Sequence, residues 1–190
     1  SVNVLSAVWP TRANRTLAEV IQANVEAIGM PQWGEGEQKL VCDLQAKINK
    51  KTTGMPTQVT PLKECVQSVS ANDSGEVSWV VPTGLITFPS NIPGVSYHHW
   101  SAGVSLATTI AHKGAVAGAK AMAASALDLF MDPKLVAQAK ETFKAEIGDT
   151  EYRPLLPPDQ KPPLELNRDL MERHRPAMRE HYLKDKPVFR

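Results

Sequence analysis

The sequence predicts an α/β fold in which helices dominate. In several segments apolar residues recur every three or four positions, which is the period of a helix with one buried face. Two short runs rich in β-branched and aromatic residues, 77–81 and 84–88, each end at a proline and are typical of buried strands. The hydrophobic share, 42% of 190 residues, is large enough for a folded core.

Composition excludes several classes of partner. The chain has 21 basic and 20 acidic residues, so its net charge of +1 gives no reason to expect nucleic acid or a membrane surface. His112, Lys113 and Lys120 interrupt the longest apolar run, and a membrane helix needs about 18 apolar residues. Two cysteines are too few for a disulfide framework, and no signal peptide is visible at residues 1–4. We therefore expect a reduced, cytoplasmic setting.

The first third of the chain predicts one strand and two helices. Residues 2–8 alternate loosely between apolar and polar and end at Pro10, as a short strand does. Residues 16–19, Thr-Leu-Ala-Glu, have the form of a capping box that opens a helix reaching Ile28. A second helix is expected over 35–50, with three apolar residues on one face: Leu40, Leu44 and Ile48.

The middle of the chain leads to a long helix. A loop is expected over 51–64, a short strand over 65–69 and a turn-rich acidic loop over 70–76. The helix is expected over 101–130, with a closely packing face of mostly small residues: Ala107, Ile110, Ala111, Ala115, Gly118, Ala119, Met122, Ala126 and Phe130. Tyr97-His98-His99-Trp100 precedes it, at the mouth of a strand–loop–helix unit, where α/β proteins commonly bind ligands.

The C-terminal part predicts two further helices separated by a Pro-rich strap. Asp132 and Pro133 suit the N-cap and first position of a helix that Gly148 ends. Five prolines between 152 and 163 require an extended chain. A charged helix is then expected over 166–182, interrupted at Pro176.

By spacing alone, the histidines do not define a metal site. His98 and His99 are adjacent, so on an extended segment they point in opposite directions, and ordinary loop histidines are the simpler interpretation. His112 lies in a helix, and His174 and His181 lie two turns apart in a charged tail. Asp73 and Glu76 are turn residues by default. No HExxH, GxSxG, P-loop or dinucleotide-binding motif is present.

A combination of motifs in order does carry a resemblance. These are Gly75-Glu76-Val77-Ser78-Trp79 with Pro82-Thr83, Tyr97-His98-His99-Trp100, Ala111-His112-Lys113-Gly114, Ala119-Lys120 with Met122-Ala123, Arg15-Thr16-Leu17 and Tyr152-Arg153-Pro154-Leu155-Leu156-Pro157. Together they resemble the C-terminal third of the M20 metallo-amidohydrolases, most closely the branch of aminobenzoyl-glutamate utilisation protein B. That family hydrolyses amide bonds with two divalent metals, Zn or Mn, and a carboxylate base.

The resemblance implies a division of the chain and a few site residues. Residues 1–11 would end a lid or dimerisation domain, 12–150 would form the C-terminal part of an α/β catalytic domain, and 151–190 would be the Pro-rich strap and terminal helix. His98 matches a metal-ligand position, and His99 is the alternative ligand. Three residues match a substrate-side loop: Asp73, Gly75 and Glu76. The remaining ligands and the base belong to N-terminal motifs that these 190 residues do not contain, so no catalytic residue is assigned.

Two hypotheses follow. In the first, the chain is an incomplete part of a metal-dependent amidohydrolase, inactive alone, whose substrate is an N-acyl amino acid or an aminobenzoyl-glutamate-like amide. It would require a missing N-terminal portion or a second subunit, within a homo- or hetero-oligomer, since one imidazole cannot hold two cations. In the second, it is a non-catalytic partner or scaffold module that retains the fold.

Overall fold

The structure is a computed structural model, and it describes residues 2, 4–64 and 72–182. The chain divides into two units, which we describe separately. Residues 8–152 form the helical unit, and residues 1–7 with 153–190 form the terminal unit. The strand expected over 65–69 lies outside the described residues.

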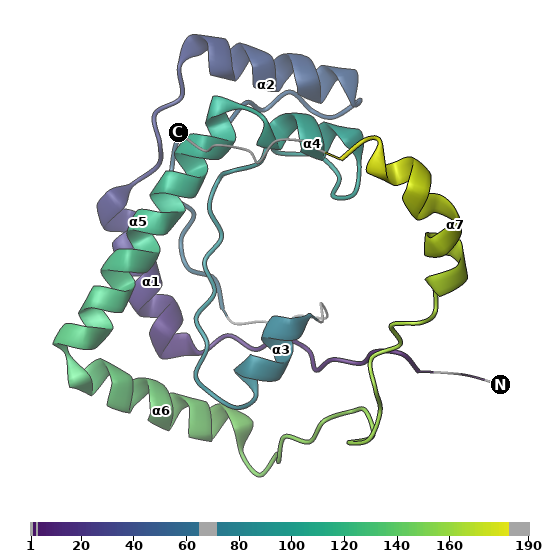
Figure 1. Cartoon of the computed structure of the whole chain (residues 1–190). Coiled ribbons are helices and arrows are strands. Elements are labelled where there is room, and N and C mark those ends of the chain that lie inside the picture. Colours follow the sequence, from purple (N-terminus) through teal and green to yellow (C-terminus); the bar gives the residue numbers. More distant parts are fainter. Residues whose placement is uncertain (1, 3, 65–71, 183–190) are drawn as a thin grey trace. The chain divides into compact units, whose positions relative to one another are not determined.

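The described part of the helical unit contains six helices: α1 (Arg15–Ile28), α2 (Glu35–Lys47), α3 (Asp73–Ser78), α4 (Trp100–Leu106), α5 (Thr109–Met131) and α6 (Pro133–Ile147). α1 packs along α5, and α6 packs against both of them. α2 and α4 lie at the end of the α1–α5 pair that is opposite α6 (Figure 1). The predicted dominance of helices is therefore confirmed.

The predicted strands are wrong for the described residues, where only an isolated bridge residue, Pro10, has β character. Residues 4–8 and 84–88 are irregular, and 77–81 comprise the end of α3 and the turn after it. β propensity describes how side chains fit a paired, half-buried surface, and the described chain offers these runs no neighbouring strand. Their composition alone therefore did not determine their structure.

α1 begins two residues earlier than the capping box predicts, because that box would make Thr16 the N-cap. Asn14 is the N-cap, and its Oδ1 accepts a hydrogen bond from the Leu17 N–H at 3.1 Å. Thr16 is instead buried against α6, where its hydroxyl lies 2.8 Å from that of Thr142. Asn is at least as good an N-cap as Thr, so the helix begins where Asn14 can cap it and Thr16 faces a packing partner.

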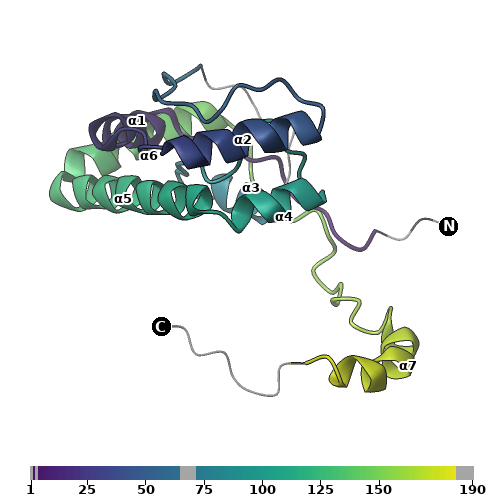
Figure 2. The same ribbon diagram turned by 90° about the horizontal axis from the view of Figure 1, so that it is seen from above.

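The long helix expected over 101–130 is two helices. Thr108 is the N-cap of α5 with extended backbone, and its hydroxyl donates to the Ser105 carbonyl at 2.7 Å. The Thr108 backbone N–H donates to the same carbonyl at 3.3 Å, so both groups of Thr108 help to satisfy a carbonyl at the end of α4. Figure 2 shows α4 beyond the N-terminal end of α5, and Figure 1 shows the change of direction between them.

The buried face of α5 is rotated from the predicted one. The buried residues are Ile110, Ala111, Gly114, Gly118, Ala121 and Ser125. Six residues expected to be buried are exposed: Ala107, which precedes α5, and Ala115, Ala119, Met122, Ala126 and Phe130. Residues 88–90 lie over Gly114 and Gly118, and α1 also packs along α5. By length and composition alone α5 also qualifies as a membrane span, contrary to the sequence expectation, although one face packs against α1.

The hydrophobic core of the helical unit lies between α2 and the start of α5. It contains Val41, Leu44, Met55, Ile92 and Ile110, whereas Leu40 is exposed, contrary to expectation. Gln45 is fully buried beside this core. Its Oε1 accepts from the backbone N–H groups of Thr53 and Gly54, and its Nε2 donates to the Pro93 carbonyl at 3.0 Å. These bonds offset the cost of burying an amide and hold two loops against α2.

The C-terminal elements follow the sequence closely. Asp132 caps α6 by accepting a hydrogen bond from the Lys134 N–H at 2.9 Å, and α6 ends at Gly148, as expected. In the terminal unit, residues 153–167 are irregular. α7 spans Arg168–Arg179 and continues through Pro176, so the interruption expected there is wrong. Gln160 joins the two parts of this unit by donating to the Val4 carbonyl at 2.8 Å.

Candidate functional site

His98 lies in the turn that leads into α4, and its side chain is exposed. Its backbone has φ 60°, in the left-handed region that costs a non-glycine residue about 1 kcal/mol or more. Among the described residues no hydrogen bond or ion pair engages its ring. Backbone strain at a site is a reason to suspect a function for it. His98 therefore presents an accessible imidazole on a strained turn.

His99 has a structural role in the same segment. It is the N-cap of α4, and its Nδ1 accepts a hydrogen bond from the Ser101 N–H at 3.3 Å and lies 2.8 Å from the Ser101 hydroxyl. Its ring also lies 5.2 Å from that of Trp100, centroid to centroid. One nitrogen of His99 is thus engaged by the helix, and only Nε2 remains for a ligand.

The described residues do not assemble a metal centre. No group of three or more His, Cys, Asp or Glu side chains within them is placed to hold a metal ion. A catalytic zinc site normally needs three protein ligands and an open position. The donor set of the described chain therefore does not fit a complete one- or two-metal centre, and His98 is at most one ligand of one.

The predicted substrate-side loop is the short helix α3. Gly75 is buried, and a Cβ on it would lie 1.9 Å from the Trp9 carbonyl oxygen. Glu76 Oε1 accepts the Trp9 N–H at 3.0 Å, while its Oε2 is buried without a partner in the described structure. Both residues therefore hold the chain around Trp9. Asp73, in the first turn of α3, is exposed.

An aromatic cluster that the sequence analysis missed surrounds Glu76. The ring of Trp9 lies 4.6 Å from that of Trp79 and 6.0 Å from that of Tyr152, and the Arg12 guanidinium lies 4.7 Å from the Trp79 ring. A hydrogen bond with the Glu76 carboxylate raises the pKa of Tyr152. These residues lie up to 143 positions apart (152 − 9), so no local pattern indicated them.

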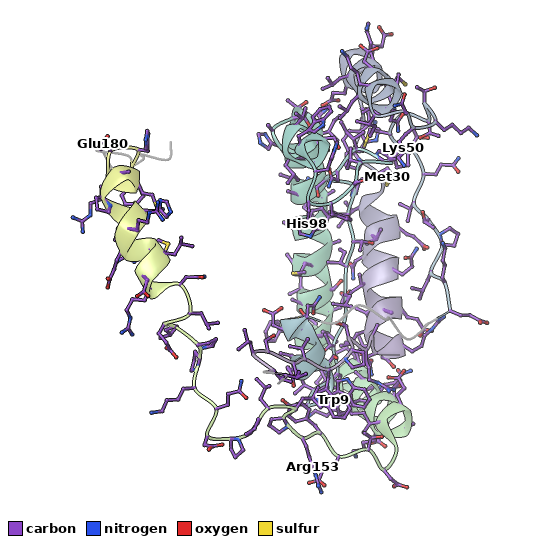
Figure 3. All side chains as sticks on the ribbon, turned by 90° about the vertical axis from the view of Figure 1, so that its right-hand side faces the viewer. Trp9, Met30, Lys50, His98, Arg153 and Glu180 are labelled. Atoms are coloured by element: carbon purple, nitrogen blue, oxygen red, sulfur yellow. The ribbon has the colours of Figure 1, made fainter. Side chains whose placement is uncertain are left out.

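The two predicted site regions are not brought together. α3 lies toward the α6 end of α5, whereas α4 lies at its opposite end (Figure 1). Figure 3 shows Trp9 beside α3 and His98 nearer to α4. Among the described residues no hydrogen bond or ion pair joins α3 to residues 97–100.

A polar cluster at the start of α5 includes Lys113, which belongs to the motif Ala111-His112-Lys113-Gly114. Lys113 Nζ lies 2.6 Å from Glu37 Oε2, and the Thr109 hydroxyl donates to Glu37 Oε1 at 2.6 Å. Hydrogen bonds from Lys113, Thr109 and the Gly34 N–H lower the pKa of Glu37 to about 2. This cluster joins α2 to α5. His112 lines a shallow neighbouring cleft, and His174 and His181 are exposed in the terminal unit.

Comparison with known proteins identifies a distant relative. The chain is 26% identical over 164 residues to one of the subunits of p-aminobenzoyl-glutamate hydrolase from Escherichia coli strain K12. The match covers 73% of this chain and 34% of the relative, so the chain spans about a third of that protein's length. No protein-family profile matches the chain, and no solved structure is significantly similar to it.

Proposed function

We propose that this chain is part of a hydrolase that cleaves the amide bond of an aminobenzoyl-glutamate-like substrate or another N-acyl amino acid. The observation that carries the proposal is the similarity to the p-aminobenzoyl-glutamate hydrolase protein over 164 residues. The finer assignment, an M20-type metallo-amidohydrolase with an α/β catalytic domain, comes from the resemblance of the motifs. The partner in this proposal is the rest of a longer protein or a second subunit.

His98 is the proposed metal ligand; both histidines are exposed, and the strained backbone of His98 supports that choice over His99. His99 is the less suitable candidate because its Nδ1 is engaged by the start of α4. The other ligands, for two Zn or Mn ions, and the base would come from outside these residues. Since the described donors do not fit a complete centre, we derive no catalytic step.

On the substrate side we propose only Asp73. Gly75 and Glu76 are occupied by contacts with Trp9, so their role in the proposal is to position the segment that carries Asp73.

The test measures release of p-aminobenzoate from p-aminobenzoyl-glutamate, with metal content determined by elemental analysis. The 190-residue chain alone should be inactive. In the complete protein, or with the second subunit supplied, His98→Ala should remove most of the activity and reduce the bound metal. His99→Ala, as the matched control, should have a much smaller effect on both.

Three results would contradict this proposal in different ways. Loss of activity on His99→Ala alone would show that the ligand is the neighbouring histidine. Activity of the 190-residue chain alone would refute its incompleteness. A complete assembly that neither binds metal nor hydrolyses the amide would favour the non-catalytic scaffold module.

A further inference from the structure

A cleft of about 500 Å³ lies on the α1–α5 pair, away from the histidine turn. Its floor is apolar and partly built from small residues: Ala18, Ile21, Val25, Ala117, Gly118 and Ala121. Two segments without regular secondary structure, residues 85–89 and 56–63, also line it.

Segment 84–88 is fixed on the helices at both ends by glycine contacts. A Cβ on Gly84 would lie 2.7 Å from Ile21 Cδ1 of α1, and a Cβ on Gly118 would lie 2.4 Å from the Phe88 ring. Both distances are shorter than an ordinary van der Waals contact. The segment and the helices can therefore lie this close only because Gly84 and Gly118 have no side chain. The sequence therefore seats this segment directly on the α1–α5 layer.

The N–H groups of this seated segment are unpaired in the described structure, although the Phe88 carbonyl accepts from the Ser90 N–H at 2.8 Å. None of the N–H groups from Gly84 to Phe88 donates a hydrogen bond to any residue that the structure describes. In segment 56–63, side chains use several carbonyls, since Trp33 donates to Pro56 and Gln22 donates to Thr60. A row of unpaired backbone groups beside an apolar surface is a template for another strand.

We propose that this cleft receives an extended polypeptide strand from outside the 190 residues, which pairs with the backbone of 84–88. This inference goes beyond the proposed function and does not depend on hydrolysis. Pairing would satisfy the orphan backbone groups and cover Leu85 and Phe88, which are 48% and 40% exposed. The match covers only 34% of the p-aminobenzoyl-glutamate hydrolase protein. We assign the added strand to a segment that corresponds to the unmatched part of that protein.

A strand fits the lining better than a small molecule does. Small-molecule pockets orient their ligands with a few convergent polar side chains. Among the described residues that line this cleft, Lys63 alone is charged, and most of the floor side chains are apolar. The unpaired groups lie in a row along the backbone, as β-strand addition requires. The β-branched and aromatic residues in this region predicted strands. On this proposal the segment becomes a strand only when the partner strand is bound, and not in the chain alone.

The test is amide hydrogen exchange on segment 84–88. The 190-residue chain is compared with the natural protein, purified in the assembly in which it occurs. In the chain alone these amides should exchange rapidly. In the assembly, alternate amides should be slowed by about 100-fold or more, because a strand edge pairs every second residue on each side. Equal rates in both samples would overturn the proposal, including the case in which a small molecule fills the cleft.

Proline variants provide a second readout. Leu85→Pro and Ile86→Pro each remove one N–H, and adjacent N–H groups point to opposite edges of a strand. One of the two should lower retention of the partner polypeptide by about tenfold, while the other and the control Ile86→Val should not. Because the segment is unpaired in the chain alone, all three variants should keep its melting temperature. Retention unchanged in both proline variants would overturn the proposal.

Discussion

At the scale of single residues, Gly75 is the glycine with the least room for a side chain. Its Cα faces the Trp9 carbonyl so closely that an added methyl group would lie 1.9 Å from that oxygen, and neither atom is on a flexible side chain. The loop that precedes α1 is therefore held against α3 by the absence of a side chain. This packing contact should affect the stability of the fold rather than its chemistry.

Gly75→Ala should lower the free energy of unfolding by at least about 1–3 kcal/mol, because the overlap with backbone cannot relax by a rotamer change. Gly36→Ala in α2 is the matched control, since nothing lies within 4 Å of its added Cβ. There the greater helix propensity of Ala should raise stability by up to about 1 kcal/mol. Urea unfolding of both variants decides the question, and equal midpoints would contradict the packing of Gly75.

Glu37 gives a pH dependence whose sign is fixed by its hydrogen bonds. Its pKa in the folded chain is about 2, below the ordinary value of 4.5. The stabilising contribution of the carboxylate is therefore complete above pH 4.5 and is lost as the pH falls from 4.5 toward 2. Solvent screening limits this contribution to about 1 kcal/mol.

Glu37→Gln should consequently lose stability relative to the natural chain at pH 6, and the difference should shrink as the pH approaches 2. Glu35→Gln is the control, because Glu35 is exposed in the first turn of the same helix. The measurement is the free energy of unfolding from pH 2 to pH 7. A constant difference between Glu37→Gln and the natural chain would mean that Glu37 is not ion-paired.

At the scale of elements, local sequence signals predicted where helices form. They did not predict the features that depend on residues far away in the sequence, such as which helix face is buried. The N-cap Asp132 and the proline after it identified α6 because both act within one helical turn. The face of α5 could not be read in the same way, since small residues occupy nearly its whole circumference. The contacts of Glu76 with Trp9 and Tyr152 connect residues far apart in sequence. His98 could be singled out only through the family resemblance.

The rotated face of α5 yields a paired test. Gly118→Leu should lower the free energy of unfolding by about 1–3 kcal/mol or more, because the new side chain overlaps the Phe88 ring. Ala119→Leu, one residue later, should change it by no more than about 0.5 kcal/mol, because Ala119 is exposed. Thermal and urea unfolding of the two variants measure this. If Ala119→Leu were the damaging change, the face predicted from sequence would be correct.

At the scale of the whole molecule, α4 and α5 leave several large apolar side chains in solvent. They include Leu106, Val116, Met122, Leu127, Phe130 and Met131, and Phe130 is 85% exposed. We call these six residues the apolar surface of α4 and α5, and exposed apolar surfaces commonly mark contacts with another protein. Leu164 is also exposed, but it belongs to the terminal unit and lies outside α4 and α5.

The 190-residue chain should therefore bind a hydrophobic dye and self-associate at high concentration. Introducing Met122→Lys and Phe130→Lys together should reduce both effects severalfold. The control is Leu164→Lys, which adds the same kind of charge at a residue that is 86% exposed outside this apolar surface. Light scattering and dye fluorescence provide the measurements. A clean monomer without dye binding in the unmodified chain would contradict the expectation.

The contact between Trp9 and Tyr152 also bears on how the gene can be rearranged. These rings, 6.0 Å apart, belong to nearly the first and last residues of the helical unit, so its two ends meet. A unit with adjacent ends can be inserted into a loop of another protein without stretching its host, and it tolerates circular permutation. Joining residue 152 to residue 8 through a short glycine linker and opening the chain at the exposed Gly148 should therefore preserve the packing of α1 against α5.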